Sequence, residues 1–224
     1  MALIMTKDQK KVIIAIDGPS GSGKGTVAHY LANKFNLKIL DTGLLYRVVA
    51  KLAIQQRIEA DQHNSIVEIT KKVTAEDVTQ EGLRSEDVAA MASKIAVIPE
   101  VRSILNKIQR HFALSDPGEH AGVILDGRDI GTVICPDADC KIYLTAAEEV
   151  RVLRRMKQEG NICQLDVQRM MAERDKRDSS RPTAPLNTAQ DAYIIDSTHL
   201  SIDEVCQKAS YYVQKSCLPD TMSA

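Results

Sequence analysis

The 224-residue sequence has no tryptophan, only two phenylalanines and almost no net charge. Its 29 Lys and Arg residues against 30 Asp and Glu give a formal net charge of −1. This balance argues against a globally basic surface that would bind nucleic acid or an anionic membrane. No apolar run reaches the roughly 18 residues of a membrane span, and the apolar residues 1–5 are too few for a secretory signal. We therefore expect a cytoplasmic protein, a monomer without nucleic-acid or membrane partners.

Cysteine is also scarce and unpatterned. The five cysteines are Cys135, Cys140, Cys163, Cys206 and Cys217, an odd number without metal-ligand spacing. This pattern predicts reduced cysteines that pack in the fold, rather than a zinc site or a disulfide. The five histidines are scattered and form no recognisable pairing of a nucleophile with a base.

Apolar runs alternate with helical patterns along the chain. This alternation predicts an α/β fold in which helices cover both faces of a parallel sheet. The predicted strands are residues 12–17, 38–40, 122–126, 141–144 and 192–195. The predicted helices are residues 25–35, 43–56, 85–95, 100–113, 147–157, 166–177 and 202–215. Residues 57–92 are polar and indicate an insertion.

A glycine-rich loop follows the first predicted strand and precedes the first predicted helix. Its residues are Gly18, Pro19, Ser20, Gly21, Ser22, Gly23, Lys24, Gly25 and Thr26. Glycines let backbone N–H groups approach a phosphate closely, and the helix N-terminus and a lysine add positive charge. A glycine-rich turn with an accidental lysine is the alternative, but the flanking strand and helix favour a nucleotide-phosphate site.

The second distinctive region is the arginine-rich helical stretch of residues 148–181. It contains Arg151, Arg154, Arg155, Arg169, Arg174, Arg177 and Arg181. Interspersed acidic residues indicate a solvated, ion-paired helix, and that interpretation suits Arg151 and Arg169. The other arginines match the planar fork that binds phosphate. Two unit charges on phosphorylated substrates repel each other by about 4 kcal/mol at a separation of about 4 Å and an effective dielectric constant near 20. Arginines and Mg²⁺ would offset this repulsion. We therefore infer a kinase for a small phosphorylated acceptor.

Acidic residues close four of the predicted strands, and two of these strand ends carry further polar residues. The closing residues are Asp17, Asp41, Asp126 and Asp196. We expect several of them to face one crevice at the carboxyl edge of the sheet. The alternative is that some of them only cap helices or turns. After the second strand, Thr42 can cap the following helix, and a phosphate bound there would explain Arg47. The stretch Asp126-Gly127-Arg128-Asp129 follows the third strand, where a tight turn with a local ion pair is the alternative.

Taken together, residues 18–26, 41–47, 126–132, 173–181, 184–186 and 195–198 resemble the bacterial cytidylate kinases. The resemblance covers nearly the whole chain from Val12 to about Tyr212. It implies a P-loop kinase three-layer fold with a central five-stranded parallel sheet, a helical lid and a shortened acceptor-binding insertion. The implied single domain, residues 1–224, has its core in 11–56, 93–147 and 189–217, its insertion at about 57–92 and its lid at about 148–182.

The resemblance also implies the reaction and the residues that perform it. ATP would bind at residues 18–26 with Mg²⁺ held by Thr26, directly or through water, and CMP or dCMP would accept the phosphoryl group. The implied catalytic residues are Lys24, Arg128 and Arg181, and Arg154 or Arg155 would support the donor nucleotide or the lid. Thr42, Arg47, Arg128 and Arg181 would hold the acceptor phosphate, and Ser93, Arg102 and Asp129 would read cytosine. Arg174 and Asp178 would contact the sugar, and Tyr46 would line the pocket.

One segment departs from the family pattern, and other functions stay open. Residues 59–86 are too short and too poor in strand signals for the β-rich insert of the longer family members. A P-loop kinase for UMP or for a non-nucleotide hydroxyl is the alternative enzyme. A nucleotide-operated switch would need a guanine-reading Asn-Lys-x-Asp motif, whereas Asn33-Lys34-Phe35-Asn36 ends in asparagine.

Overall fold

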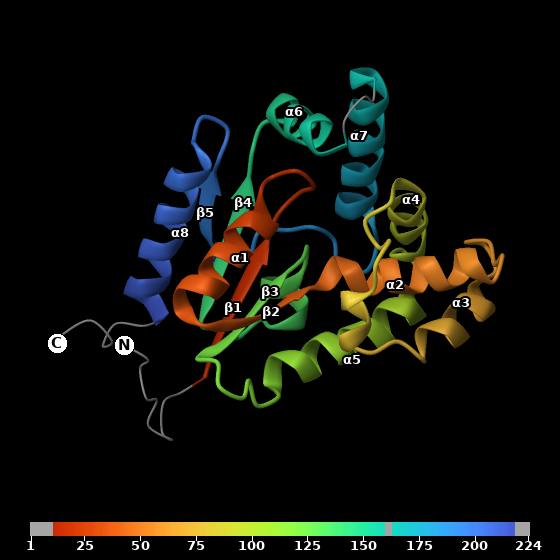
Figure 1. The fold of residues 1–224 in the computed structure, drawn as a ribbon, viewed down its shortest axis with the longest axis horizontal. Helices are drawn as coiled ribbons and strands as arrows, with labels where there is room; N and C mark the ends of the chain where they lie inside the picture. The colour runs from red at the N-terminus through yellow and green to blue at the C-terminus, as the bar shows by residue number, and fades with distance from the viewer. Residues whose placement is uncertain (1–10, 160–162, 218–224) are drawn as a thin grey trace.

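The computed structural model describes residues 11–159 and 163–217, and within them a sheet of five parallel strands forms the centre of the fold (Figure 1). The strands lie in the order β2-β3-β1-β4-β5. Their bounds are β1 Val12–Asp17, β2 Leu37–Asp41, β3 Gly122–Asp126, β4 Cys140–Thr145 and β5 Tyr193–Asp196. The predicted five-stranded parallel sheet is therefore confirmed, with strand ends within two residues of the predicted ones.

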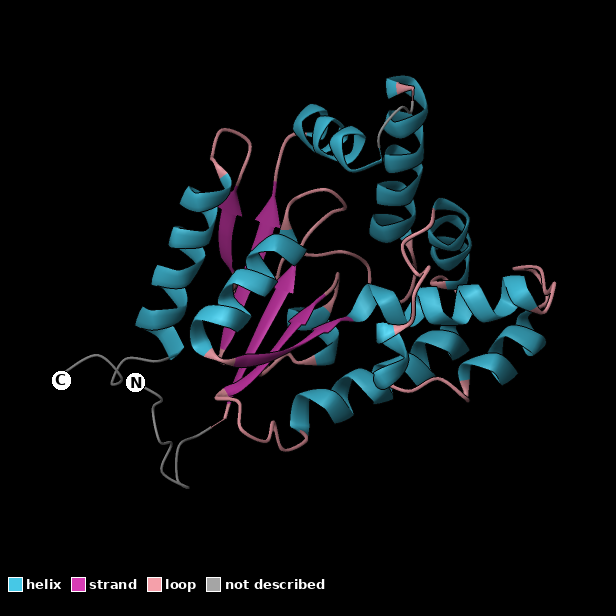
Figure 2. Cartoon of the chain, in the orientation of Figure 1, coloured by secondary structure: helices cyan, strands magenta, loops and turns pink. Residues whose placement is uncertain are grey.

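Side chains alternate between the two faces of the sheet, and both faces are buried. On β1, Ile14 and Ile16 join the core beside α1 (Lys24–Phe35) and α8 (Ile202–Cys217). Ala15 joins the other core, which contains α2 (Thr42–Gln55) and α5 (Pro99–Leu114). Because both faces are covered at the centre of the sheet, β1 and β3 are nearly continuous apolar runs. Figure 2 shows the resulting three layers of helix, sheet and helix.

The segment predicted as a polar insertion is helical and packs into the core. It consists of α3 (His63–Thr70), the short 3₁₀ helix η1 (Glu76–Thr79) and α4 (Glu86–Ile95). Ile66, Leu83 and Val88 are buried in the same core as α2 and α5. In Figure 1 these helices extend from the sheet beside α2, on the right of the view.

Two further helices stand beyond the carboxyl ends of the strands, at the top of Figure 1. They are α6 (Glu148–Glu159) and α7 (Gln164–Ser180). Val152 of α6 packs against Val167 and Met171 of α7 in a small core of their own. A π-helical turn, η2 (Ile130–Ile134), follows β3. In the part of the chain that the structure describes, no helix is long and apolar enough to span a membrane.

The prediction that the cysteines are all reduced is wrong for two of them. Cys140 at the start of β4 and Cys217 at the end of α8 form a disulfide, with their Cα atoms 6.2 Å apart. Cys135, Cys163 and Cys206 carry free thiols. The two bonded cysteines are 77 residues apart in sequence, and only the packing of α8 against the sheet brings them together.

Candidate active site

The glycine-rich loop joins β1 to α1 and is shaped by close backbone contacts. A Cβ atom on Gly18 would lie 2.0 Å from the Leu144 carbonyl oxygen, so only glycine fits there. Lys24, the first residue of α1, is buried, and its Nζ donates to the Pro19 carbonyl at 2.8 Å. The Ser22 hydroxyl donates to the same carbonyl at 3.0 Å. These bonds hold the lysine side chain against the base of the loop.

The four acidic strand ends have different positions. Asp41 lies opposite Asp126 in the β2–β3 register, and both line the cleft described below. Asp17 is instead buried, and its carboxylate accepts N–H bonds from Ile130 at 2.8 Å and Gly131 at 2.7 Å. Asp196 is exposed and accepts a bond from the Thr198 backbone at 2.9 Å. The expected acidic crevice is thus formed by two of the four residues.

A cleft of about 350 Å³ extends from the glycine-rich loop past these strand ends to α4, α5 and α7. Among the residues proposed from the sequence, it is lined by Ser20, Gly21, Gly23, Lys24, Gly25, Thr26, Thr42, Tyr46, Arg47, Ser93, Arg102, Arg128, Asp129, Arg155, Arg174, Asp178 and Arg181. Gly18, Pro19 and Ser22 form the buried base of the loop, and Arg154 turns toward Ser197. The folded chain therefore gathers almost every proposed residue around one cavity.

The cleft carries a strong excess of positive charge. Eight Lys and Arg side chains line it, against four Asp, a formal excess of four positive charges in a chain of net charge −1. Burial and the neighbouring Arg128 lower the pKa of Arg174 to about 10. Burial and nearby arginines likewise lower the pKa of Arg47. Such a site gains stability when it binds an anion such as phosphate.

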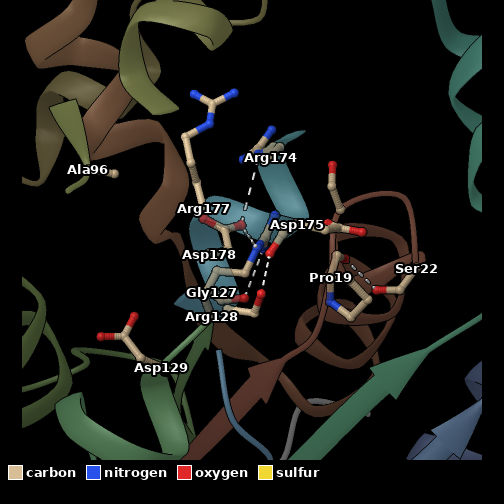
Figure 3. A network of polar contacts seen from close by, with 12 residues as sticks. Pro19, Ser22, Ala96, Gly127, Arg128, Asp129, Arg174, Asp175, Arg177 and Asp178 are labelled. Carbon is tan, nitrogen blue, oxygen red and sulfur yellow. Dashed lines mark hydrogen bonds and ion pairs between the residues drawn. The ribbon is translucent and has the colours of Figure 1, made fainter. Parts of the chain in front are cut away.

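One carboxylate, Asp178 of α7, organises the arginines (Figure 3). Its Oδ2 pairs with Arg128 Nε at 3.1 Å and with Arg174 Nε at 4.0 Å. Its Oδ1 lies 3.9 Å from Arg181 Nη1. Burial disfavours the charged carboxylate, but the three arginines outweigh it and hold the pKa of Asp178 below its usual value. Asp178 therefore stays ionised and holds three guanidinium groups around the cleft.

A second buried ion-pair network lies where α5 meets the segment after β3. Arg102 Nη2 and Asp129 Oδ2 are 2.5 Å apart, with side-chain exposures of 2% and 9%. Arg181 Nη2 approaches the other oxygen of Asp129 at 3.4 Å. The Arg102 guanidinium also lies 5.7 Å from the centre of the Tyr46 ring. Ser93 Oγ and Arg102 Nε are buried without a hydrogen-bond partner among residues 11–159 and 163–217, which leaves polar atoms for a ligand.

Lys24 and Asp126 form an electrostatically linked pair in the centre of the cleft. Burial and the nearby Arg128 lower the pKa of Lys24 to about 7, against the pull of Asp126. Burial raises the pKa of Asp126 to about 6. Thr42, expected to cap α2, instead donates its hydroxyl to the Asp126 carbonyl at 2.8 Å. That bond ties the start of α2 to the loop of Gly127 and Arg128.

Arg151, interpreted from the sequence as part of a solvated ion-paired helix, is ion-paired but buried, so the solvated part of that interpretation is wrong. Its Nη1 donates to the Ser20 carbonyl at 3.1 Å and pairs with Asp175 at 2.5 Å. Arg169 does lie in an exposed ion pair with Glu173, at 3.3 Å, as predicted.

Arg154, assigned to the donor nucleotide or the lid, contacts the loop from outside the cleft. Its Nη1 donates to the Ser197 hydroxyl at 2.8 Å and to the Ser22 carbonyl at 3.4 Å. Arg155 is the arginine of this pair that lines the cleft.

The sequence did not predict the roles of three residues in the site's surroundings. Asp17 holds the start of η2 by the two backbone bonds described above, and Ser197 supports the glycine-rich loop. Arg84 lines the cleft and pairs with Asp41 at 3.3 Å. Asp17 carried the signal of its place at the end of the strand before the loop, and Ser197 lies in the stretch 195–198 that resembles the family.

Comparison with known proteins relates this geometry to a family. The family model for cytidylate kinase matches residues 14–215. The chain belongs to the cytidylate kinase family. A cytidylate kinase from Methylocella silvestris is 44% identical over 209 residues, covering 92% of this chain and 95% of that protein. Cytidylate kinase 1 from Haemophilus influenzae is 40% identical over 224 residues, covering 91% of this chain and 94% of that protein. The predicted membership of the cytidylate kinases is thus confirmed.

Solved structures with low sequence identity support the fold of this cytidylate kinase family member. An uncharacterized protein from Eubacterium ventriosum matches with a TM-score of 0.55 at 18% identity, covering 91% of this chain and 99% of that chain. A sugar kinase from Janibacter matches with a TM-score of 0.50 at 16% identity, covering 92% and 95%. At this identity the likeness concerns the fold alone.

Proposed function

We propose that the protein transfers the γ-phosphate of ATP to CMP or dCMP, giving ADP and CDP or dCDP. The observation that carries the proposal is one cleft with a phosphate-binding loop at one end and the buried Arg102–Asp129 pair at the other. The arginines around Asp178 lie between them. Membership of the cytidylate kinase family supports the same reaction.

The glycine-rich loop and Lys24 would bind the donor. The loop's backbone N–H groups and the N-terminus of α1 would hold the phosphates of ATP, and Lys24 would neutralise the transferring group. Without a bound phosphate Lys24 has a lowered pKa, so a phosphate dianion beside it would raise that pKa and fix its charge.

The residues present fit a magnesium ion bound together with ATP. Magnesium needs only one or two protein oxygens when substrate phosphates and water supply the rest. The Thr26 hydroxyl and the Asp126 carboxylate both line the cleft and are oxygen donors of the right kind. Among residues 11–159 and 163–217 no cluster of three or more His, Cys, Asp or Glu could hold a metal alone. When bound, Mg²⁺ would neutralise charge on the phosphates.

The arginines would bind the acceptor phosphate and stabilise the charge of the transition state. Arg47, Arg128 and Arg181 line the cleft from α2, from the segment after β3 and from the end of α7. Their forks match phosphate oxygens bidentately, and their fixed positions minimise reorganisation during transfer. Thr42 would act indirectly, because its hydroxyl is bonded to the Asp126 carbonyl. An ionised phosphate acceptor needs positioning rather than a general base.

The Arg102–Asp129 pair would read the base. A carboxylate accepts a hydrogen bond from the exocyclic amine of cytosine, whereas uracil presents a carbonyl at that position. The hydroxyl of Ser93, buried without a partner in the described chain, would contribute a further bond. Arg174 and Asp178 of α7 would contact the sugar, and α6 and α7 would exclude water as a lid. A cytoplasmic location and a monomeric state stay predictions.

The direct test is product analysis after incubation with ATP, Mg²⁺ and CMP. We expect ADP and CDP in equal amounts, measured by anion-exchange chromatography. ADP without CDP would show an ATPase and would contradict the proposal.

A further inference from the structure

A buried arginine outside the cleft connects the lid to the phosphate-binding loop. Arg151 lies on α6, and three groups from three segments receive its hydrogen bonds. Its Nε donates to the Ala146 carbonyl at 3.1 Å, and its Nη1 donates to the Ser20 carbonyl at 3.1 Å. The same Nη1 pairs with Asp175 of α7 at 2.5 Å. With a side chain only 9% exposed, Arg151 can make these bonds only while α6, α7 and the loop hold this arrangement.

Packing at the same place makes the contact specific. A Cβ added to Gly21 would lie 3.1 Å from the Arg151 Cβ and 3.1 Å from the Met171 Cε. Met171 is itself buried between α6 and α7. The tip of the loop therefore rests directly on both lid helices.

The helix that carries Asp175 also carries side chains of the acceptor side. Arg174 and Asp178 line the cleft on one side of α7, while Asp175, between them in sequence, pairs with Arg151. Figure 3 shows Asp175 at the part of α7 next to the loop of Pro19 and Ser22. One turn of α7 thus carries Arg174 and Asp178, which line the cleft, and Asp175, which is linked through Arg151 to the glycine-rich loop.

We propose that Arg151 and Asp175 are positioning residues that fix the ATP-binding loop relative to the lid helix α7. By holding the Ser20 carbonyl outward, Arg151 keeps the loop's backbone N–H groups directed at the phosphates of the donor. Asp175 holds the Arg151 fork in place, since a guanidinium pinned by a carboxylate loses fewer orientations when it binds a carbonyl. This inference rests on the proposed function for the identity of the donor, ATP.

The test measures ATP affinity without an acceptor, by isothermal titration of the full-length chain. The variants are Arg151→Met, Arg151→Lys, Asp175→Asn and the double variant Arg151→Met/Asp175→Asn. Arg169→Met is the matched control, because Arg169 pairs with Glu173 on the exposed side of the same lid. We expect about tenfold weaker ATP binding for Arg151→Met, a smaller loss for Arg151→Lys, and no change for the control.

The double variant distinguishes positioning from other roles. If Asp175 acts through Arg151, adding Asp175→Asn to Arg151→Met weakens ATP binding no further, and the KM for CMP changes less than about threefold in each variant. A lowered melting temperature with unchanged ATP affinity would overturn the inference, because the pair would then be purely structural. Additive losses would also overturn it, because the two residues would then act independently. Tighter ATP binding in Asp175→Asn would overturn it as well, because Arg151, released from Asp175, would then contact ATP itself. A higher kcat/KM for another acceptor than for CMP and dCMP would refute the proposed function and leave this inference intact, since ATP binding is measured alone.

Discussion

Replacing the base-reading carboxylate by its neutral isostere, Asp129→Asn, probes recognition of cytosine most selectively. Asp129 sits between Arg102, with 2% of its side chain exposed, and Arg181, with 4%. Removing the whole side chain would leave two buried cations without their carboxylate, a cost of about 3–5 kcal/mol for a broken buried pair. That is a large part of a typical total stability of about 5–15 kcal/mol. Asparagine keeps the volume and one acceptor, so it is the better variant.

The expected loss follows from the hydrogen bond to cytosine. A bond to a charged acceptor contributes about 1.5–3 kcal/mol, so kcat/KM for CMP should fall about 10- to 150-fold. The asparagine amide can also donate to the uracil carbonyl, so kcat/KM for UMP should fall less or rise. The CMP-to-UMP ratio of kcat/KM should therefore decrease at least about tenfold.

A coupled assay of ADP release with CMP and with UMP measures this ratio. The matched control is Asp191→Asn, which weakens an ion pair with Lys141 outside the cleft and should leave the ratio unchanged. An unchanged CMP-to-UMP ratio in folded Asp129→Asn would refute the assignment of Asp129 to the base.

Four further predictions concern transfer, acceptor binding, pH and stability. Lys24→Ala should abolish phosphoryl transfer in the coupled assay but keep the native circular dichroism spectrum; near wild-type turnover would remove Lys24 from the mechanism. Arg181→Met should lower kcat/KM for CMP at least about tenfold and change the KM for ATP less, and the reverse order would contradict its assignment. Because the pKa of Lys24 is lowered to about 7 and only its protonated form is charged, kcat/KM for ATP should decline above pH 7. With ATP bound the phosphates raise this pKa, so kcat should decline only at higher pH; a kcat/KM that rises through pH 7–9 would contradict the charged role. Without reductant, Cys217→Ser should lower the free energy of unfolding by up to about 4 kcal/mol. Reductant should lower the free energy of unfolding of the parent chain only. Five free thiols in the unreduced, unfolded parent chain would disprove the disulfide.

The central strands β1 and β3 could be predicted because they are buried on both faces. Residues 12–17 and 122–126 are nearly continuous apolar runs that end in aspartate, and the structure places them as β1 and β3 with the predicted bounds. The helix α3, in contrast, was not predicted. Its residues include asparagine, serine and four β-branched side chains, which have low helix propensity. It is helical because Ile66 and Ile69 are buried in the core, a tertiary effect.

The residues around the cleft differ in how far sequence could predict their positions. Segments that follow strands, such as Asp126 to Asp129, gather at the carboxyl edge of a parallel sheet as a rule, so their meeting was predictable. The burial of Arg151 was not predictable, because the charge pattern around it equals that of a solvated helix. Its burial depends on the packing of α6 against the glycine-rich loop. The contact of Ser197 with Ser22 was not predictable either, since it joins residues 175 positions apart.

The measurement that tests the proposed reaction most directly is kcat/KM with ATP and Mg²⁺ for CMP, dCMP, UMP, AMP and GMP in one coupled assay. We predict that CMP and dCMP are the best acceptors, and that UMP, AMP and GMP are at least about tenfold poorer. A higher kcat/KM for UMP or for a purine nucleotide than for CMP would contradict the proposed function.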